Sequence, residues 1–413
     1  MTSFPRDFVW GAATAAHQVE GNNINSDLWV LEHCKPTLFE EPSLDACDHY
    51  HRFSDDIRLL ASVGLNCYRF SVEWARIEPE EGHFSISELD HYRRVLACCH
   101  ENKITPMVTF YHFSSPRWFA ARGGWEKRDA GDLFVRYCER SAKHLGDLIS
   151  LASTFNEPNL PQLLRWVSNV EIPFTTVMRM SRQATKALGG NKFGCFFLGD
   201  ADRLQHHMIA AHHRALAALK SGPGAYPVGV NVSLQDEQAV GPASKRDQKC
   251  AQVYDPWIAA GGDSDFLGIQ VYTRCRVNKK GDMGPEHGVE VTQMGYEFWP
   301  DALEVCLRYA ADRVKVPIYI TESGIATDND ARRVEYIQRS LEGALRAIAS
   351  GIDVRGYIHW SLLDNFEWIF GYRPKFGLVA VDRTTQQRTI KPSAHYLGEI
   401  ARHNRMPHPA SVG

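Results

Sequence analysis

Residues 151–159 read LASTFNEPN, and residues 316–324 read VPIYITESG. Each stretch is a short, dense apolar run that ends in a glutamate and leads into a turn-forming Pro or Gly. Apolar runs of this kind are typical of strands that are covered on both faces, as in a parallel sheet. They raise the question of why Glu157 and Glu322, far apart in the chain, share the same local setting.

Similar β-like runs recur along the chain, and most are followed by a helical pattern. Further strands are predicted at 8–14, 66–72, 105–112, 227–233, 265–272 and 355–362. Apolar residues at spacings of three and four predict helices at 53–63, 88–101, 131–149, 206–220, 301–314 and 332–349. Only KCAQVYDPWIAA (249–260) supports a helix between the fifth and sixth strands, and the polar, Gly-rich segment 273–296 is predicted to be a long loop.

Eight strands alternating with helices predict an α/β fold, a single-domain (β/α)8 TIM barrel. The structural alternative is a doubly wound open sheet, which normally carries G-x-G-x-x-G after its first strand. The first predicted strand leads into FVWGAATAAHQ (8–18), which lacks that pattern. No low-complexity linker divides the chain, so residues 1–413 are expected to form one catalytic domain.

Composition limits the partners and the location. Lys plus Arg number 46 against 49 for Asp plus Glu, and the formal charge of -3 gives no electrostatic reason to expect nucleic acid or an anionic membrane as partner. The N-terminus lacks a secretory pattern, and no apolar run approaches the roughly 18 residues of a membrane span. Ten scattered cysteines without a C-x-x-C pair favour reduced thiols and a cytoplasmic location.

In such a barrel, the C-terminal strand ends meet at one mouth. Glu157 ends the fourth predicted strand and Glu322 the seventh, so the two carboxyls are expected to face each other there. Two facing carboxyls surrounded by indoles and neutral hydrogen-bonding groups are the equipment for cleaving a glycosidic bond. The candidate residues at these strand ends and in the loop after the eighth are Gln18, Arg69, Glu73, His112, Asn156, Glu157, Tyr272, Glu322, Trp360, Asp364, Asn365, Glu367 and Trp368.

Six motifs give the chain a family resemblance. They are FVWGAATAAHQVEG, YRFSVEWARIEP, FNEPN, FLGIQVYT, ITESG and WSLLDNFEW followed by GYRPKFGLVAVD. In this order and spacing they resemble glycoside hydrolase family 1, the retaining β-glycosidases of the (β/α)8 class. The resemblance runs from Phe4 to KPSAHYL (391–397), which is nearly the whole chain.

The resemblance implies a role for each matching residue. Glu157, in the N-E-P motif, would be the acid/base, and Glu322, in T-E-[NS]-G, the nucleophile. Asn156 would hold the 2-hydroxyl of the sugar, while Arg69 and Tyr272 would contact the nucleophile. No metal or organic cofactor is implied. The residues that would cradle the sugar on the non-reducing side of the cleaved bond are Gln18, His112, Trp360, Glu367 and Trp368.

The chain also departs from the family pattern. Where the family usually reads N-Y-Y, residues 270–272 read QVY, and the common H-W-D-L-P appears as HFSSP (112–116). The usual loop after FNEPN is unrecognisable, and the segment between VNVS and DFLGIQ is short (234–264). Because these loops build the leaving-group side in relatives, the shortened loops predict a more open site there. One of Tyr296 and Trp299 is expected to line that side.

The expected activity is that of a β-glucosidase with possible β-galactosidase or β-fucosidase activity on a small β-glycoside. The Glu367 carboxylate would repel a sugar phosphate, which favours a neutral sugar. Two alternatives stay open: a transglycosidase, and a sugar-binding barrel without turnover. The histidines of 206–213 and the Asp/His group of 48–55 are expected to be solvated or hydrogen-bonded and not metal ligands. Both a monomer and a homo-oligomer are compatible with the sequence.

Overall fold

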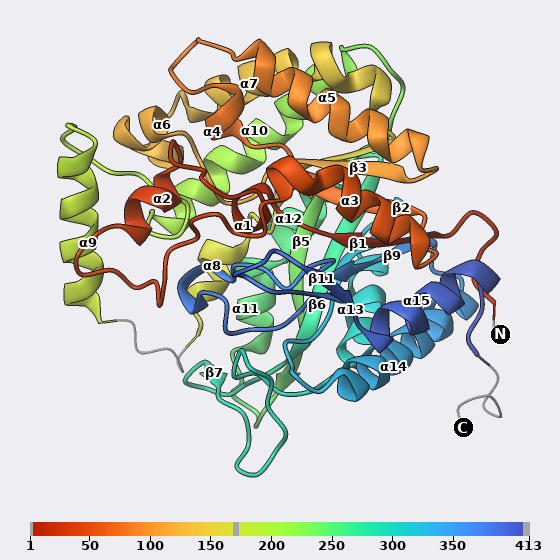
Figure 1. The fold of residues 1–413 in the computed structure, drawn as a ribbon. Coiled ribbons are helices and arrows are strands. Elements are labelled where there is room, and N and C mark those ends of the chain that lie inside the picture. The colour runs from red at the N-terminus through yellow and green to blue at the C-terminus, as the bar shows by residue number, and fades with distance from the viewer. Residues whose placement is uncertain (1–2, 168–172, 408–413) are drawn as a thin grey trace.

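The computed structural model describes residues 3–167 and 173–407, and a closed barrel of parallel strands lies at its centre (Figure 1). The strand order is β5-β4-β3-β2-β1-β9-β8-β6, and β5 also pairs with β6, which closes the sheet on itself. The predicted (β/α)8 TIM barrel is therefore confirmed, and each predicted strand has its counterpart. The barrel strands are β1 (Val9–Ala13), β2 (Cys67–Ser71), β3 (Thr105–Tyr111), β4 (Leu151–Asn156), β5 (Val228–Ala239), β6 (Phe266–Val277), β8 (Ile318–Ser323) and β9 (Val354–Trp360).

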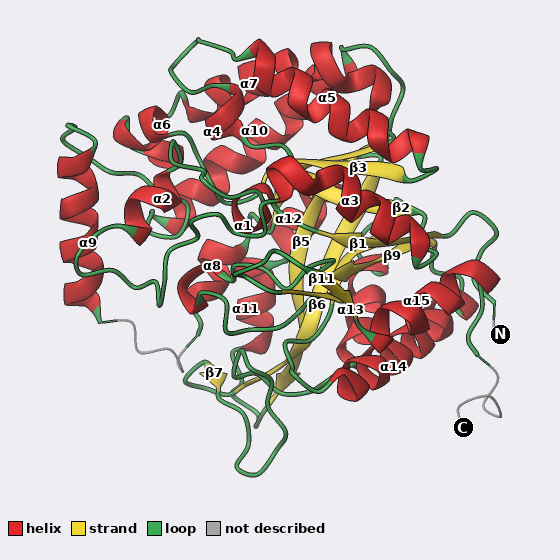
Figure 2. Ribbon diagram, in the orientation of Figure 1, coloured by secondary structure: helices red, strands yellow, loops and turns green. Residues whose placement is uncertain are grey.

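Helices surround the barrel, as Figure 2 shows by colour. The helices predicted from periodicity are all present, and the weak segment 249–260 falls on two short helices, α11 and α12. The larger helices are α3 (His49–Ser62), α5 (Ile86–Glu101), α7 (Ala130–Leu145), α9 (Phe174–Ala187), α10 (Ala201–Lys220), α11 (Arg246–Val253), α12 (Asp255–Gly262), α13 (Ala302–Ala311), α14 (Asp330–Ala349) and α15 (Pro392–His403). The short elements are α1 (Ala16–Val19), α2 (Asp27–Glu32), α4 (Trp74–Ile77), α6 (Arg117–Ala121), α8 (Leu160–Leu164), η1 (Gly124–Glu126), η2 (Gly146–Leu148), η3 (Trp368–Phe370) and the hairpin β10 (Val379–Val381) and β11 (Arg388–Ile390).

Capping side chains explain where several helices begin. The Asp200 carboxylate accepts hydrogen bonds from the first backbone N–H groups of α10, so this helix starts before the predicted residue 206. Ser85 caps α5 through the N–H of Glu88, and Asn329 caps α14. These caps satisfy donors that lack a partner inside the helix. Apolar periodicity cannot detect them, which is why the predicted starts were late.

Strands β5 and β6 continue together beyond the barrel, and this corrects the predicted loop 273–296. Their pairing runs on to Ala239 opposite Val277, and the two-residue strand β7 (Asp282–Met283) adds to β6 in antiparallel direction. Ion pairs of Arg274 with Glu297 and of Arg276 with Glu286 balance the polar side chains that suggested a loop. The rest of the segment does form a loop, which projects at the bottom of Figure 1.

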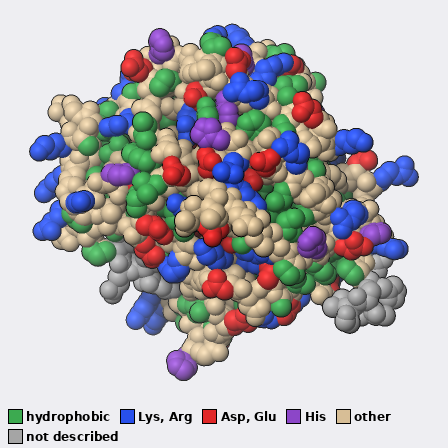
Figure 3. Space-filling view, in the orientation of Figure 1, with side chains coloured by type: hydrophobic (Ala, Val, Ile, Leu, Met, Phe, Trp, Pro, Cys, Tyr) green, Lys and Arg blue, Asp and Glu red, His purple; other side chains and the backbone are tan. Residues whose placement is uncertain are grey.

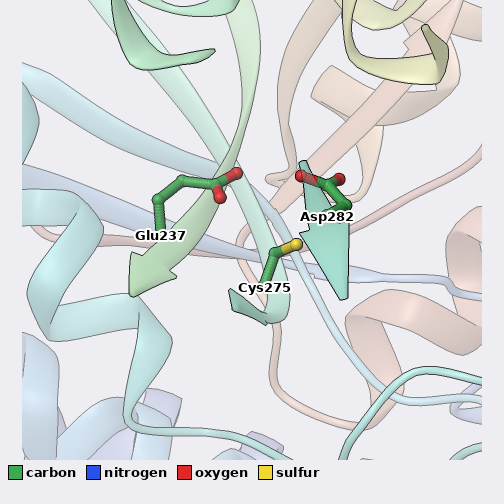
Figure 4. Close-up of side chains that lie close together, drawn as sticks. All are labelled: Glu237, Cys275 and Asp282. Atoms are coloured by element: carbon green, nitrogen blue, oxygen red, sulfur yellow. The ribbon is translucent and has the colours of Figure 1, made fainter. Parts of the chain in front are cut away.

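A buried lysine holds this extension together. The Lys249 ammonium, on α11, is fully buried and lies 2.7 Å from Glu237 on β5 and 2.8 Å from Asp282 on β7. The two carboxylates converge with the Cys275 thiol on β6 (Figure 4). Burial lowers the pKa of Lys249, but Glu237, then Cys275 and Asp282, outweigh this and raise it, while burial raises the pKa of Glu237 to about 7. We call Glu237, Lys249 and Asp282 the rim clamp.

Three further observations bear on composition. All ten cysteines lie in the described residues and are free thiols, nine of them buried, as predicted. Acidic and basic side chains are interspersed on the face shown in Figure 3. Among the helices of residues 3–167 and 173–407, none has the length and hydropathy needed to cross a bilayer.

The rim clamp generates a stability prediction. Lys249→Met should destabilise the protein by about 3–5 kcal/mol, because it leaves two buried carboxylates without their cation. Urea unfolding at neutral pH, followed by tryptophan fluorescence, measures this.

The matched control is Lys143→Met, which removes an exposed ion pair with Glu139 on α7. It should change stability by at most about 0.5 kcal/mol. If Lys249→Met were as stable as the control variant, the rim clamp would have no structural role.

Candidate active site

The Arg69 guanidinium contacts residues at the C-terminal ends of two other strands, which form the mouth of the barrel. It comes from β2 and is 1% exposed. One terminal nitrogen donates to Glu322 Oε1 at 2.5 Å, and the other donates to Asn156 Oδ1 at 2.5 Å. One rigid fork from β2 therefore connects β8 with β4, and three residues from distant parts of the chain form one cluster.

Glu322 reaches this cluster because β8 carries an irregularity in its register. Ile269 of β6 pairs with Ile320, but Gln270 pairs with Glu322, so Thr321 is skipped in the register between β6 and β8. An extra residue of this kind redirects the side chain that follows it, and such bulges are frequent beside active sites. Glu322 then receives a second donor, since the Tyr272 hydroxyl donates to Oε2 at 2.5 Å. The structure thus brings Arg69 and Tyr272 onto Glu322.

Glu157 follows β4 in a left-handed backbone conformation, with φ of 42°. Such a φ is uncommon for a residue other than glycine and is often found at functional sites. The backbone N–H of Glu157 donates to the Asn231 carbonyl at 2.9 Å, which ties this residue to β5. Burial and, next, the charge of Glu322 raise the pKa of Glu157 to about 8, against smaller lowering effects of Ser233 and Arg69.

The two carboxyls therefore interact, and they differ in surroundings. Burial also raises the pKa of Glu322, but the Arg69 charge and the Tyr272 hydroxyl oppose this shift directly. Among the residues that the structure describes, no cation is in ion-pair contact with Glu157. The arrangement favours a proton on Glu157 and a negative charge on Glu322 near neutral pH.

The predicted sugar-cradling residues surround this pair. Gln18, in α1, donates to the Phe366 carbonyl at 2.7 Å and to Glu367 at 3.4 Å. The Gln18 Oε1 atom is buried and has no partner among the residues that the structure describes. Burial and the charges of Glu322 and Glu157 raise the pKa of Glu367 to about 8, which places all three carboxyls near one another.

Aromatic rings close the same side. The His112 ring, directly after β3, lies nearly parallel to Trp360 and Trp368, with centroids 5.8 Å and 6.2 Å away. Burial and the Arg69 charge lower the pKa of His112 well below its ordinary value, so the ring is neutral. Its Nδ1 is another buried polar atom without a partner in the described part of the chain. Flat rings beside unpaired polar atoms suit the C–H faces and hydroxyls of a pyranose.

Three of the candidate residues, one near a strand end and two in the loop after the last strand, have structural contacts instead. Glu73 caps α4 through the Ala75 N–H and accepts a hydrogen bond from Ser114. Asp364 pairs with Lys391, and Asn365 accepts from Gln18 while donating within its own loop. These residues support the walls of the mouth.

Of the two aromatic candidates for the leaving-group side, Tyr296 is the one at the site. Its ring lies 6.5 Å from Tyr272, and the charges of Glu367, Glu157 and Glu322 contribute to raising the pKa of Tyr296, after burial and Tyr336. Trp299 instead donates to Asp236 and packs under Arg274 at 3.7 Å.

The departures from the family pattern have local consequences. Phe113 packs against His112, Phe196 and Trp368, so aromatic packing persists with a smaller ring. The altered segment after FNEPN forms α8 and α9, and its residues 168–172 lie outside the described part of the chain.

Two contacts were missed by the sequence-based selection of site residues. Gln270 was noted only as a departure from the motif, yet it donates to Glu322 at 2.8 Å. Ser233, which lowers the pKa of Glu157, ends the predicted strand 227–233, and that position was the signal that could have found it.

The described residues offer one acidic group with metal-ligand geometry, formed by Glu237, Cys275 and Asp282. The Lys249 ammonium already contacts both carboxylates there, so a cation of the protein itself occupies the role of a metal. Of the histidines on α10, His207 bonds the Trp125 carbonyl and His212 bonds Thr154 and Ser264. These contacts agree with the expectation of hydrogen-bonded histidines.

Comparison with known proteins agrees with this geometry. The model of glycosyl hydrolase family 1 matches residues 1–260 and 254–406. β-Glucosidase A of Acetivibrio thermocellus is 30% identical, over 97% of this chain and 99% of its own. A bifunctional β-D-glucosidase/β-D-fucosidase of Bifidobacterium breve is 32% identical, over 94% and 96%. The apo structure of β-glucosidase 1317 is 48% identical and superposes with a TM-score of 0.93, over 97% and 99% of the two chains. The chain therefore belongs to glycosyl hydrolase family 1 and is a glycoside hydrolase.

Proposed function

We propose that this protein removes a terminal β-D-glucosyl residue from the non-reducing end of small β-glycosides, with retention of configuration. The observation that carries this proposal is the electrostatic difference between two interacting carboxyls. Glu322 lies against a guanidinium, whereas Glu157 has no cation in contact among the described residues. A retaining mechanism needs both roles, one carboxylate that attacks and one carboxylic acid that donates a proton.

In the first step, Glu322 attacks the anomeric carbon while Glu157 transfers its proton to the departing oxygen. The bond between that carbon and the leaving group breaks, and an ester between the sugar and Glu322 forms. The raised pKa of Glu157 keeps the required proton in place at neutral pH. Tyr272 and Arg69 hold Glu322 ionised and aimed.

In the second step, Glu157 is a carboxylate and takes a proton from water. The water oxygen bonds to the anomeric carbon from the face that the leaving group vacated, and the Glu322 carboxylate departs. Two inversions give net retention. An acceptor sugar in place of water would give a longer glycoside, so product analysis at high substrate concentration separates hydrolysis from transglycosylation.

The relatives support glucose and fucose as sugars, since their names include β-glucosidase and β-D-glucosidase/β-D-fucosidase. The Glu367 carboxyl, bonded to Gln18, suits neutral hydroxyls. Ten free thiols support a reducing, cytoplasmic setting for the reaction.

The catalytic roles predict distinct effects of two substitutions. Glu157→Gln should lower kcat for an aryl β-glucoside with a poor leaving group by about 10²–10⁴-fold, because it removes the proton donor. Glu322→Gln should lower the rate for every leaving group, because no ester can form.

Azide provides the control for these assignments. Glu157→Ala with azide and an activated aryl glucoside should give the β-glycosyl azide, since azide replaces water on the ester. In Glu322→Gly, azide should attack the anomeric carbon of the substrate directly and give the α-glycosyl azide. The opposite anomers would reverse the two roles, and an inactive wild-type protein would favour a sugar-binding barrel.

The pH dependence follows from the direction of the shifts. Glu157 must be protonated to donate, and its pKa of about 8 means that kcat/KM should fall as the pH rises through about 8. Glu367 has a similar raised pKa, so this limb belongs to the coupled carboxyls. A kcat/KM profile with an aryl β-glucoside measures it. A profile that stays flat to pH 9, or a limb unchanged in Glu157→Gln, would contradict the assignment.

A panel of aryl glycosides tests the sugar class. We expect hydrolysis of the β-glucoside and β-fucoside, and a rate at least about 10²-fold lower for the β-glucoside 6-phosphate, because the phosphate would approach the Glu367 carboxyl. Preference for the phosphorylated sugar would contradict the neutral-sugar assignment.

A further inference from the structure

Gln270 has a place in the barrel that its sequence motif does not explain. It lies on β6, is fully buried, and pairs in register with Ser233 on one side and with Glu322 on the other. Parallel partners in register point to the same face of a sheet, so Gln270 and Glu322 both project into the barrel interior. Where the family pattern usually has asparagine, this chain has a side chain that is one methylene longer.

The Gln270 amide connects two functional groups through a single nitrogen. Its Nε2 donates to Asn156 Oδ1 at 2.6 Å and to Glu322 Oε1 at 2.8 Å. An amide nitrogen carries two protons, and each of these acceptors takes one. The orientation of the Gln270 amide is therefore fixed, because its oxygen would be repelled by an ionised carboxylate in the same place.

The first contact decides how Asn156 is oriented. Asn156 Oδ1 receives Gln270 Nε2 and Arg69 Nη2, so a flipped amide would set its own NH₂ group against two donors. Asn156 Nδ2 must then face His112 Nε2, which lies 3.2 Å away and accepts. In the proposed function, this fixed amide is the group that meets the 2-hydroxyl of the sugar.

The second contact decides how Glu322 is held. Its Oε1 accepts from Arg69 and Gln270, and its Oε2 accepts from Tyr272. Arg69 approaches from β2 and Gln270 from β6, the strand next to β8. Donors from two directions fix the plane of the carboxylate and stabilise its ionised form.

We propose that Gln270 is a positioning residue that aligns the nucleophile with the group that holds the sugar's 2-hydroxyl. This rests on the proposed function of Glu322 and Asn156, and it adds that the two are coupled through one side-chain amide. Hydrogen bonds at the 2-hydroxyl strengthen in the transition state, so this coupling acts on the rate of bond cleavage. Asparagine here would fall short by about 1.5 Å, the length of one C–C bond, and could not reach both acceptors.

The test uses Gln270→Met, which keeps the length and removes both donors. On an aryl β-glucoside, kcat/KM should fall by about 10²-fold. On the matching 2-deoxy glucoside the loss should be about 10-fold, because the Asn156 contact no longer has a hydroxyl to meet. The acid limb of the pH profile should also move to higher pH, since Glu322 loses a donor to its ionised form.

Gln162→Met is the matched control. Gln162, in α8, is also a buried glutamine that donates to a carboxylate, in this case Asp202 on α10, and it has no contact with the catalytic carboxyls in the described residues. It should leave the acid limb and the ratio between the two substrates unchanged. Gln270→Asn provides a second variant if Gln270→Met does not fold, and it should lose either the dependence on the 2-hydroxyl or the normal acid limb.

Three outcomes are distinguishable. Activity of Gln270→Met within about threefold of wild type, or an equal loss on both substrates with an unchanged acid limb, would overturn the role of Gln270. For Gln270→Asn, wild-type values in both measurements would do the same. A wild-type protein that does not cleave the glucoside would instead overturn the proposed function itself.

Discussion

The contact between Arg69 and Glu322 is the interaction on which the catalytic mouth depends. A guanidinium without water around it is costly unless a carboxylate and further acceptors surround it. Glu322, the Thr321 carbonyl and Asn156 provide these acceptors, from β8 and β4. Arg69 on β2 therefore connects the ends of β8 and β4, which are not neighbours in the barrel. The planar guanidinium also fixes the directions in which Glu322 and Asn156 accept its hydrogen bonds, which the ammonium of a lysine could not do.

The same cation explains how two glutamates can take the opposite protonation states that the proposed mechanism requires. Glu322 is buried and Glu157 is partly buried, and burial raises the pKa of each. Arg69 and Tyr272 donate hydrogen bonds to Glu322 and favour its negative charge. That charge in turn raises the pKa of Glu157. Burial contributes most to the raised pKa of Glu157, and the charge of Glu322 contributes next. Because each state depends on its partner, the pair behaves as a unit and not as two independent groups.

Much of this fold could be predicted from the sequence because a parallel barrel buries its strands on both faces. All eight strands appeared as apolar runs, and ten proposed site residues fell at strand ends or in the loop after the last strand. Helix starts such as that of α10 could not be placed, because a cap depends on one carboxylate and not on periodicity. The extension of β5 and β6 was missed because its charged side chains are balanced by ion pairs with residues in the following loop. Gln270 could not be assigned a contact, because its reach depends on a one-residue irregularity in β8 that leaves no trace in composition.

The rim clamp has a consequence for where the chain can accept insertions. Its ion pairs fix the extension of β5 and β6 to α11, so this part of the wall is a packed sheet and not a free loop. The turn between β6 and β7, where the Asn278 N–H donates to the Gly281 carbonyl, lies at the end of this extension. Extra residues inserted at this turn would lengthen the outgrowth and leave the ion pairs of Lys249 in place. The tip of the outgrowth is therefore the place where this part of the chain can change in length without altering the contacts of Glu157 and Glu322.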